Sequence, residues 1–539
     1  MIKLFLVTLL VSANLFIVPV GAVPKVKSYA LPIPSMEPGV IPDSLKQAVT
    51  EETAQPVRPG IPGKHPFWNV ESKEFIYAPA FDFKEVVGAT CYRFTVTPKD
   101  SGQALKFEAQ VPWVALSPIW KQVPIGFVKL TVEGIDRGKV IGVAGTRDFY
   151  RKAVFEGRRP AAVRGYKECG VLKLKHLYES SYVKYWLNHD SPDPDYGYYC
   201  YPSKMIGGIL KGLTRYSQIN PEAREQALKM ARNAAEFLIR ISEPHNSFYA
   251  FFPPTYRGNE HAAKDQNDVV MMIYPAGVAM GYLDVYDATR DKRYFDAAQR
   301  IAKTYVKTQL ANGTWPIKVK ARTGEVVSNN PTVPIGIIRL FKHLDKQYGC
   351  TEFRPPLKMA MDWIIRNPIK TFNWEGQFED IDLEKPYKNL SKGQACDIAA
   401  YMLENADDSL EYQPWALELI RFAEDQFVVW GRPNPDLKPD NWLLPCALEQ
   451  YSWMSPINAS ATDMLRAWAA AYLRTGQELF RLKAQAMANV MTVSQLSDGE
   501  LPTYWFYTGD CWLNCAVYSA IHMIELEDVG IRAVVLKKE

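Results

Sequence analysis

The spacing of apolar residues changes once along the chain, and this change separates two predicted parts. From residue 67 to residue 146 the period is two: Tyr92, Phe94 and Val96 alternate with polar neighbours, and two further runs repeat the pattern. Turn-forming residues separate these runs. Because such alternation is typical of strands with one buried face, we expect residues 67–146 to form a small antiparallel β-sandwich.

Apolar residues of the remaining chain, residues 147–539, recur at helical spacing. In the clearest helix, Asn220 stands at the N-cap position, Pro221 at the first helical position, and Leu228 and Leu238 fall on one face. Asparagine is a preferred N-cap and proline a preferred first helical residue. We therefore expect an all-α domain over residues 147–539.

A weak internal repeat organises this helical part. Six times, a segment with aromatic residues and Gly, Asn or Asp precedes an apolar helix, at intervals of roughly 50 to 65 residues. The apolar helix is generally followed by a more amphipathic and charged one, which is the order that an inner and an outer ring of helices require. The segments lie near Gly197, Asn246, Asn312, Asn373, Asn441 and Asp498.

Six such hairpins resemble the six-hairpin glycosidase superfamily, whose fold is an (α/α)6 toroid. A single helix, starting near Asp510, follows the last segment, so we expect a helix within 170–187 to be its outer partner and to close the ring. A helical solenoid has the same period and is the alternative, but its loops would not concentrate Trp, Tyr, Glu and Asp. The β-sandwich resembles a fibronectin type III or immunoglobulin-like module. The predicted fold is therefore multidomain, with the β-sandwich preceding the toroid.

The first residues have the features of an export signal. Lys3 is followed by an apolar run that ends at the small residues Gly21 and Ala22. This pattern predicts a signal peptide over residues 1–22, with an uncleaved anchor as the alternative. Residues 23–66 are rich in proline, which predicts an extended strap or linker without regular structure. We expect a periplasmic or secreted protein without a stable membrane anchor.

Composition narrows the possible functions. A net charge of +4 without a basic stripe argues against a nucleic-acid partner. The eight cysteines are spread thinly and match neither a disulfide framework nor a zinc site. Because nucleotide and phosphate-binding motifs are also missing from the sequence, we expect no metal and no cofactor. Aromatic residues make up 12% of the chain, and Trp and Tyr supply the faces on which sugar rings stack.

The loops that precede the inner helices of a toroid converge at one end, where we expect a sugar-binding cleft. Glycoside hydrolysis needs two carboxyl groups across the scissile bond, one protonated and one ionised. Glu379, beside Phe378, is the expected acid, because an apolar setting raises the pKa of a carboxyl. Asp268 precedes an apolar run that we interpret as the start of an inner helix, where N–H groups favour an ionised base; an N-cap is its alternative role. The alternate carboxyls are Glu375, Asp380 and Asp510.

Substrate-binding residues are expected in the same loops. Arg257 could hold a sugar carboxylate bidentately, so an oligosaccharide or polysaccharide with an acidic sugar is the expected partner. Gln377 and His261 add polar groups near the expected carboxyls. The expected stacking platforms are Trp315, Trp374 and Trp505, each of which could instead pack in the core.

Three segments carry a closer resemblance: GQFEDI, LSKGQACDIAAYML and LIRFAEDQFVVWG. They resemble glycoside hydrolases of gut Bacteroidota that act on plant or host glycans, and the chain resembles glycoside hydrolase family 154. This resemblance implies β-glucuronidase activity. The preference for a uronate comes from the resemblance, with Arg257 as its support among the residues.

Two other classes of function remain open at this point. A polysaccharide lyase neutralises a uronate and abstracts a proton with Tyr or His, and Tyr256, Arg257, His261 and Asn267 would suit this reaction within one loop. A glycan-binding protein without catalysis would keep the aromatic residues but would not need paired carboxylates. We favour the hydrolase, with the lyase as the alternative.

Overall fold

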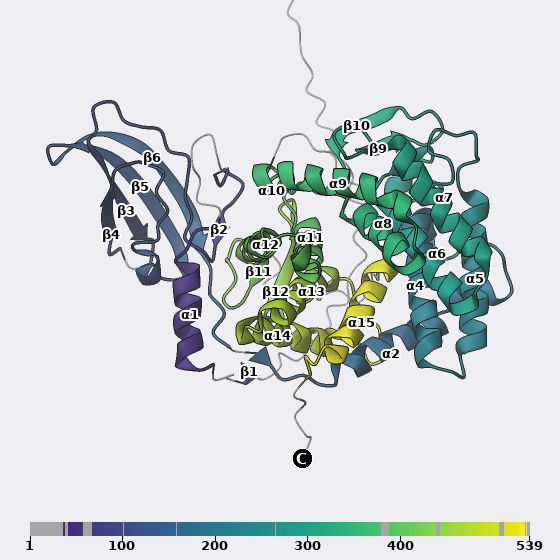
Figure 1. Cartoon of the computed structure of the whole chain (residues 1–539). Coiled ribbons are helices and arrows are strands. Elements are labelled where there is room, and N and C mark those ends of the chain that lie inside the picture. The colour runs from purple at the N-terminus through teal and green to yellow at the C-terminus, as the bar shows by residue number, and fades with distance from the viewer. Residues whose placement is uncertain are drawn as a thin grey trace, which may run out of the picture.

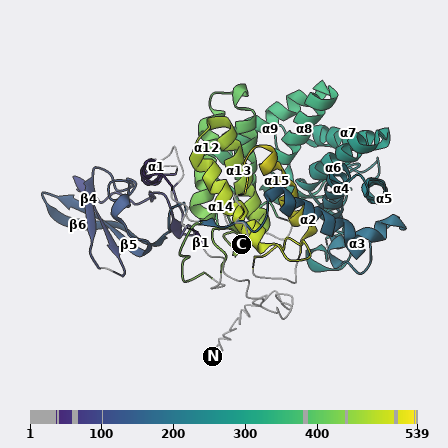
Figure 2. The ribbon, with the colours of Figure 1, turned by 90° about the horizontal axis from the view of Figure 1, so that it is seen from below.

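The computed structural model describes residues 36–37, 41–57, 67–100, 102–157, 159–264, 266–378, 387–437, 442–505, 511–533 and 535. A curled sheet lies beside a larger assembly of helices (Figure 1), and the view from below shows the same arrangement (Figure 2). The predicted signal peptide, residues 1–22, lies outside the described residues. Among those described, no helix has the length and apolar character needed to cross a membrane.

The β part is a single curled sheet of five strands in the order β2-β6-β5-β3-β4. Alternation places Tyr92, Phe94 and Val96 on its buried face, as predicted. The described strands of 74–151 form no second sheet of the kind that a sandwich requires. Irregular segments cover the buried face instead, and Phe81 and Trp120 pack there against Phe149. The strands are β2 (Glu74–Phe75), β3 (Cys91–Pro98), β4 (Leu105–Ala109), β5 (Gly126–Asp136) and β6 (Lys139–Arg151).

Part of the proline-rich segment is regular, contrary to the prediction. Residues of the stretch DSLKQAVTEET, which lacks proline, form α1 (Asp43–Thr53). Two short strands, β1 (Met36–Glu37) and β7 (Arg159–Pro160), pair with each other. A helix of eleven residues is possible here because no residue removes a backbone donor.

Six helices among the described residues form an inner ring, each packed on the next and the last on the first. This arrangement agrees with the six predicted hairpins, because each of the predicted aromatic segments precedes one inner helix. The inner helices are α4 (Pro202–Ile219), α6 (Tyr274–Thr289), α8 (Ile335–Tyr348), α11 (Gly393–Glu404), α13 (Asn458–Thr475) and α15 (Leu513–Asp528).

Each inner helix packs most extensively against one outer helix of the described chain. The pairing of α15 with α2 confirms that the helix near the start of this part closes the ring. The outer helices are α5 (Arg224–Ile241), α7 (Lys292–Thr308), α9 (Arg354–Arg366), α12 (Tyr412–Phe427), α14 (Glu478–Ser494) and α2 (Tyr166–Glu179). Two further helices, α3 (Ser181–Lys184) and α10 (Pro368–Thr371), are single turns.

Short sheets precede two of the inner helices and correct one prediction. The run after Asp268 is strand β8 rather than the start of a helix, and α6 begins only at Tyr274. Val269 and Val270 are β-branched and pair with β9, which favours the extended form. The strands are β8 (Val269–Met271), β9 (Pro316–Lys320), β10 (Val326–Pro331), β11 (Val428–Val429), β12 (Cys446–Gln450) and β13 (Trp453–Pro456).

The sheet is fixed to the ring by buried polar contacts. The carboxylate of Asp425, in α12, accepts hydrogen bonds from the backbone N–H groups of Ile76 and Tyr77 at 2.6 and 2.8 Å. Lys152, just after β6, donates to the carbonyl oxygen of Val428 at 3.0 Å. These groups are buried, so the β part and the ring share one interior.

Candidate active site in the ring

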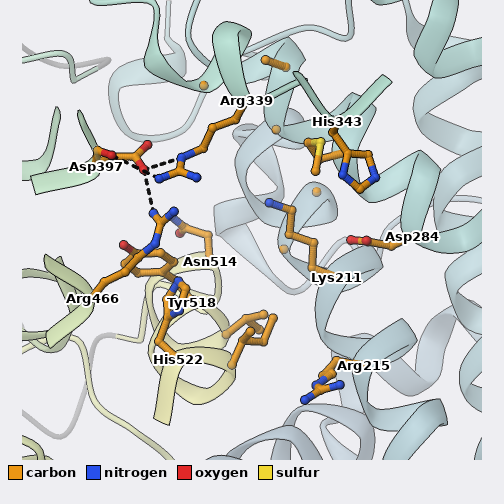
Figure 3. Close-up of a pocket in the computed structure, with 18 of the residues that line it drawn as sticks. Lys211, Arg215, Asp284, Arg339, His343, Asp397, Arg466, Asn514, Tyr518 and His522 are labelled. Carbon is orange, nitrogen blue, oxygen red and sulfur yellow. Dashed lines mark hydrogen bonds and ion pairs between the residues drawn. The ribbon is translucent and has the colours of Figure 1, made fainter. Parts of the chain in front are cut away.

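The inner helices enclose a cavity of about 820 Å³, here named the ring cavity. Its lining residues recur at helical spacing along most of the inner helices, as Lys204, Gly208, Lys211 and Arg215 do on α4. Figure 3 shows their side chains converging from the surrounding helices. The volume lies within the range of small-molecule sites, about 300–1,000 Å³. The cavity is therefore large enough for a short saccharide.

A carboxylate held by two arginines forms one wall of the ring cavity. Asp397 of α11 accepts from Nε of Arg339 and from Nη1 of Arg466, each at 2.7 Å (Figure 3). Burial by itself would raise the pKa of Asp397, but the two guanidinium groups outweigh burial and hold that pKa below its usual value. Both bonds end on Oδ1. The second oxygen, Oδ2, makes no hydrogen bond with the described residues, so Asp397 is an ionised group with one oxygen available.

A second carboxyl group lies across the ring cavity, and its pKa is shifted in the opposite direction. Figure 3 shows Asp284 of α6 on the side facing Asp397, next to Lys211. Burial raises the pKa of Asp284 to about 6, against the opposing charge of Lys211, and the nearby Asp287 adds to the rise. Within the described chain Asp284 accepts no hydrogen bond. Burial thus outweighs the nearby charge of Lys211 and shifts the balance of Asp284 towards its protonated form.

Positive charge predominates on the wall of the ring cavity. Seven Lys or Arg residues and four Asp or Glu residues are among the described residues that line it. Several are paired: Arg339 also contacts Glu404, and Lys342 contacts Asp408. Burial lowers the pKa of His343, which also lines the cavity. Lys211 makes no hydrogen bond or ion pair within the described part of the chain. An ammonium group without a partner in a cavity is suited to an anionic ligand.

A neighbouring carboxyl is linked to the cavity through a tyrosine. The hydroxyl of Tyr518, which lines the cavity, donates to Asp463 at 3.1 Å. Burial raises the pKa of Asp463, while Lys392, with Nζ 3.9 Å away, opposes the rise. Burial also raises the pKa of Tyr518 well above its usual value. Asp463 is thus a further carboxyl with a raised pKa near the cavity, one layer behind Tyr518.

Of the predicted acid and base, only Asp268 lies within the described residues. Glu379 lies in 379–386, outside the described residues, and its role as the acid stays a prediction. The side chain of Asp268 is 62% exposed and its Oδ2 lies 2.7 Å from Nζ of Lys320. Asp268 is absent from the lining of the ring cavity. An exposed ion pair of this kind is more typical of a surface contact than of a catalytic base.

The predicted lyase residues differ in their exposure to solvent. Tyr256 is fully buried, so its hydroxyl cannot reach a polysaccharide in this structure. Arg257 is exposed, with its guanidinium carbon 5.6 Å from the ring centre of Phe237. His261 is exposed and stacks on Tyr198 at 4.7 Å. The structure therefore does not assemble these residues into one acid–base site.

The three tryptophans expected as stacking platforms lie in the core instead. Trp315, Trp374 and Trp505 are among the largest fully buried side chains, at most 2% exposed. The indole N–H of Trp315 donates to the Tyr305 carbonyl, and that of Trp505 donates to Asn458. Gln377 is also buried, and its Oε1 accepts from the Val333 N–H at 2.8 Å. These side chains hold the loops in place and present no face to a sugar.

The cavity residues lie inside helices, whereas the site residues predicted from the sequence lie in loops. A signal was present: Asp284 and Asp397 each interrupt an otherwise apolar helix, as in GYLDVY and QACDIA. A charged residue on the apolar face of an inner helix cannot point to solvent outside the ring. The spacing of Lys211 and Arg215 carried the same information.

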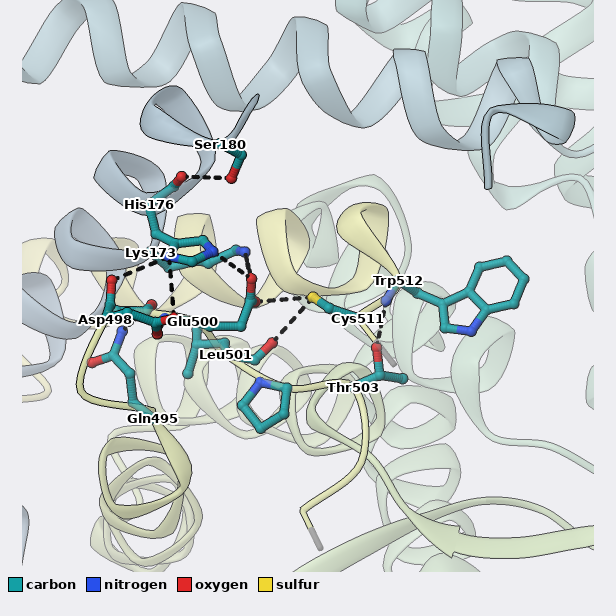
Figure 4. Close-up of polar contacts among 12 residues, drawn as sticks. Lys173, His176, Ser180, Gln495, Asp498, Glu500, Leu501, Thr503, Cys511 and Trp512 are labelled. Carbon is teal, nitrogen blue, oxygen red and sulfur yellow. Dashed lines mark hydrogen bonds and ion pairs between the residues drawn. The ribbon is translucent and has the colours of Figure 1, made fainter. Parts of the chain in front are cut away.

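A buried ionic cluster stabilises the segment that leads into α15 (Figure 4). Nζ of Lys173, on α2, lies 2.6 Å from both carboxylate oxygens of Glu500, and Nε2 of His176 lies 3.0 Å from Oε2. Burial alone would raise the pKa of Glu500, but the His176 hydrogen bond and the Lys173 charge lower it to about 2. The thiol of Cys511 donates to Oε1 at 2.9 Å. Glu500 is therefore saturated by protein groups and does not serve as a catalytic acid.

Comparison with known proteins gives resemblance in fold only. No family model and no curated protein matches the chain. Similar solved structures include a family 76 glycoside hydrolase from a bovine Bacteroides thetaiotaomicron strain, 10% identical over 86% of this chain and 98% of that one, with a TM-score of 0.46. A D-mannose isomerase is 10% identical over 67% and 97%, with a TM-score of 0.48. An unsaturated glucuronyl hydrolase specific for heparin is 11% identical over 67% and 96%, with a TM-score of 0.42. These values assign no activity to the chain.

The described part of the chain contains no candidate metal-binding site. Groups of three or more His, Cys, Asp or Glu residues with the right proximity are not found there. The eight cysteines are free thiols in this structure. The expectation that the reaction needs neither metal nor cofactor remains a prediction.

Proposed function

We propose that the protein is an exported glycoside hydrolase of plant or host glycans that releases β-linked glucuronic acid, with the ring cavity as its active site. The observation that carries the proposal is the pair Asp284 and Asp397, two carboxyl groups in one cavity whose pKa values shift in opposite directions. Environments that separate two carboxyl pKa values are the usual mark of an acid and its partner.

In the proposed reaction, protonated Asp284 gives its proton to the glycosidic oxygen as the bond from that oxygen to the anomeric carbon breaks. Asp397, ionised and with Oδ2 available, accepts a proton from the attacking water, whose oxygen bonds to the anomeric carbon. The leaving sugar thus gains a proton and the released sugar a hydroxyl group. Arg339 and Arg466 orient Asp397 through Oδ1.

The preference for an acidic sugar is supported by the charge of the cavity. Lys211, which makes no hydrogen bond or ion pair with the described residues, lies near Asp284 and interacts with it through its charge (Figure 3). A uronate carboxylate would be stabilised there by direct charge pairing. Membership of glycoside hydrolase family 154, and hence the β-glucuronide linkage, rests on the sequence resemblance.

Export rests on the features of residues 1–22, and places the enzyme in the periplasm or outside the cell. The β part is assigned a supporting role. Its buried contacts with α12, through Asp425, lie outside the lining of the ring cavity.

The test is a panel of aryl glycosides and acidic polysaccharides, read by released reducing sugar and by the absorbance of unsaturated uronate. We expect reducing sugar from a β-glucuronide and no unsaturated product. Asp284→Asn should lower turnover by about 10²–10⁴-fold, the usual contribution of a general acid. The exposed Asp268→Asn is the matched control and should keep its rate. An unsaturated product would identify a lyase, and full activity in Asp284→Asn would remove the proposed acid.

A further inference from the structure

The ring cavity runs along most of the length of the inner helices. On α4 its lining extends from Lys204 to Gln218, which corresponds to about 21 Å at the helical rise. On α8 it extends from Gly336 to Gln347, or about 17 Å. The cavity therefore has one end beside the loops that precede the inner helices, here named the loop end, and one end at the last turns of these helices, here named the far end.

The two ends of the ring cavity differ in their exposure to solvent. Among the described lining residues, every exposed side chain belongs to the last four residues of an inner helix. In the first two turns of the same helices the lining residues are buried or half-buried. The cavity is therefore open to solvent at the far end. The exposed lining residues are Gln218, Lys346, Gln347, Glu404 and Glu525.

Side chains from three segments meet at the loop end. Nζ of Lys204, in the first turn of α4, lies 4.2 Å from the ring centre of Trp512 and 5.9 Å from that of Tyr274. Lys204 and Tyr274 line the cavity, and Trp512 directly precedes α15. A cation held over aromatic faces is a stabilising contact. These side chains narrow the cavity at the loop end.

The two carboxyl groups of the proposed reaction lie at different depths in the ring cavity. Asp284 stands late in its helix, five residues before the last residue of α6, whereas Asp397 stands early in α11, four residues after its first residue. Asp284 is therefore nearer the far end. The acid protonates the oxygen that stays with the leaving sugar. The leaving sugar is thus expected on the side of the far end, and the released glucuronate on the side of the loop end.

The far end carries unpaired positive charge. The carboxylate of Glu404 lies 2.8 Å from Nη1 of Arg339, and that of Glu525 contacts the histidine one turn before it. Lys346 makes no hydrogen bond or ion pair with the described residues, and Gln347 presents an exposed amide next to it in the sequence. An unpaired ammonium at a cavity mouth attracts anions, and an amide both donates to and accepts from hydroxyl groups. The far end is therefore suited to an acidic saccharide.

We infer that an acidic saccharide enters the ring cavity at the far end with its terminal glucuronate inward, and that its remaining sugars leave the ring beside Lys346 and Gln347. The inference rests on the proposed function, since it takes the ring cavity as the active site and Asp284 as the acid. The loop end, where we expected the cleft from the sequence, is then not the entrance. A chain bound in this way is cut at its terminal residue and not between internal residues.

Lysine footprinting tells the two ends apart. The probe is the trisaccharide of glucuronate β-linked to galactobiose, added to Asp284→Asn so that it stays intact, and acetylation by acetic anhydride is read by mass spectrometry. We expect the trisaccharide to suppress acetylation of Lys346 and to leave unchanged that of Lys264, exposed in the loop before α6, and of Lys358, exposed on outer helix α9. Absence of protection at Lys346, or protection of Lys264, would overturn the inference. Protection of Lys346 in a protein that does not hydrolyse the trisaccharide would refute the proposed function while the entrance stands.

Three matched substitutions give a second test. Lys346→Trp, Lys264→Trp and Lys358→Trp each replace one exposed lysine by the same bulky side chain, so each removes one charge. We expect Lys346→Trp to lower kcat/KM for the trisaccharide by about tenfold or more, the range in which single pocket contacts act, and the other two to keep it. All three should unfold near the temperature of the unchanged protein, because surface substitutions change stability little. A loss in Lys264→Trp, or no loss in Lys346→Trp, would contradict entry at the far end.

Discussion

The side chain of Asp284 is the group whose protonation state decides the proposed chemistry. Its raised pKa of about 6 means that the protonated form is present below that pH and is lost as the pH rises through it. We expect kcat/KM for an unactivated glycoside to fall about tenfold per pH unit above pH 6. The measurement is a pH–rate profile with an activated fluoride substrate as comparison, because a good leaving group needs little protonation. A profile that is flat between pH 6 and 8 would exclude Asp284 as the acid.

Asp397 is expected to matter for stability as well as for rate. Replacing it by asparagine leaves Arg339 and Arg466 without their shared negative partner inside the ring. We expect Asp397→Asn to lower the free energy of unfolding by about 2–4 kcal/mol, near the range for breaking buried charge pairs. Urea unfolding at pH 7 measures it. Because the pKa of Asp397 is lowered in the folded state, its contribution is present above pH 4 and is lost as the pH falls through the folded pKa.

Individual functional residues were the least predictable feature of this sequence. Trp315 and Trp505 occur in loop segments typical of sugar sites, yet each turns inward to donate its indole N–H to a buried oxygen. Sequence spacing cannot reveal that choice, because it depends on partners far along the chain. Asp397 was missed because its partners Arg339 and Arg466 are far from it in the sequence and are brought to it only when the ring closes.

Among helices and strands, the hairpin repeat was predictable because it follows from local periodicity. The predicted pairing of α2 with α15 is confirmed, since an unpaired inner helix would expose its apolar face. The run after Asp268 was wrongly interpreted as a helix because short apolar runs do not distinguish helix from strand. Its pairing with β9, some fifty residues later, decides in favour of the strand.

The segment leading into α15 depends on the ionic cluster around Glu500. Glu500→Gln would leave Lys173, which is fully buried, without its anionic partner. We expect a loss of about 3–5 kcal/mol in the free energy of unfolding, the usual effect of breaking a buried pair. Thermal unfolding of the variant measures the loss, with the exposed Glu478→Gln as the matched control.

The pH dependence of the same variant gives a second check. The pKa of Glu500 is lowered to about 2, so its stabilisation is present above pH 4.5 and is lost as the pH falls towards 2. The unchanged protein should therefore lose its advantage over Glu500→Gln in that acidic window. An advantage that stays constant down to pH 2 would contradict the assigned role of Glu500.

The two parts of the molecule are expected to depend on each other. Removing residues 1–146 would leave Asp425 buried without the two N–H donors that it binds at Ile76 and Tyr77, and would expose Phe422, which contacts Trp68. We expect the shortened chain to unfold at a lower temperature and to associate through the exposed face. Calorimetry and light scattering check this, and a shortened chain as stable as the whole one would show that the ring is independent.

The ring as a whole also has one sparse joint. Of the six joints between neighbouring inner helices, that between α8 and α11 has the fewest contacts among the described residues, and Arg339 reaches across it to Asp397 and Glu404. At this joint the ring is therefore held together by the charged contacts of Arg339 as well as by the sparse packing of the two helices. Salt and acid weaken charged contacts of this kind, so we expect α8 and α11 to separate first at high ionic strength or low pH, and the width of the cavity to depend on the surrounding ionic conditions.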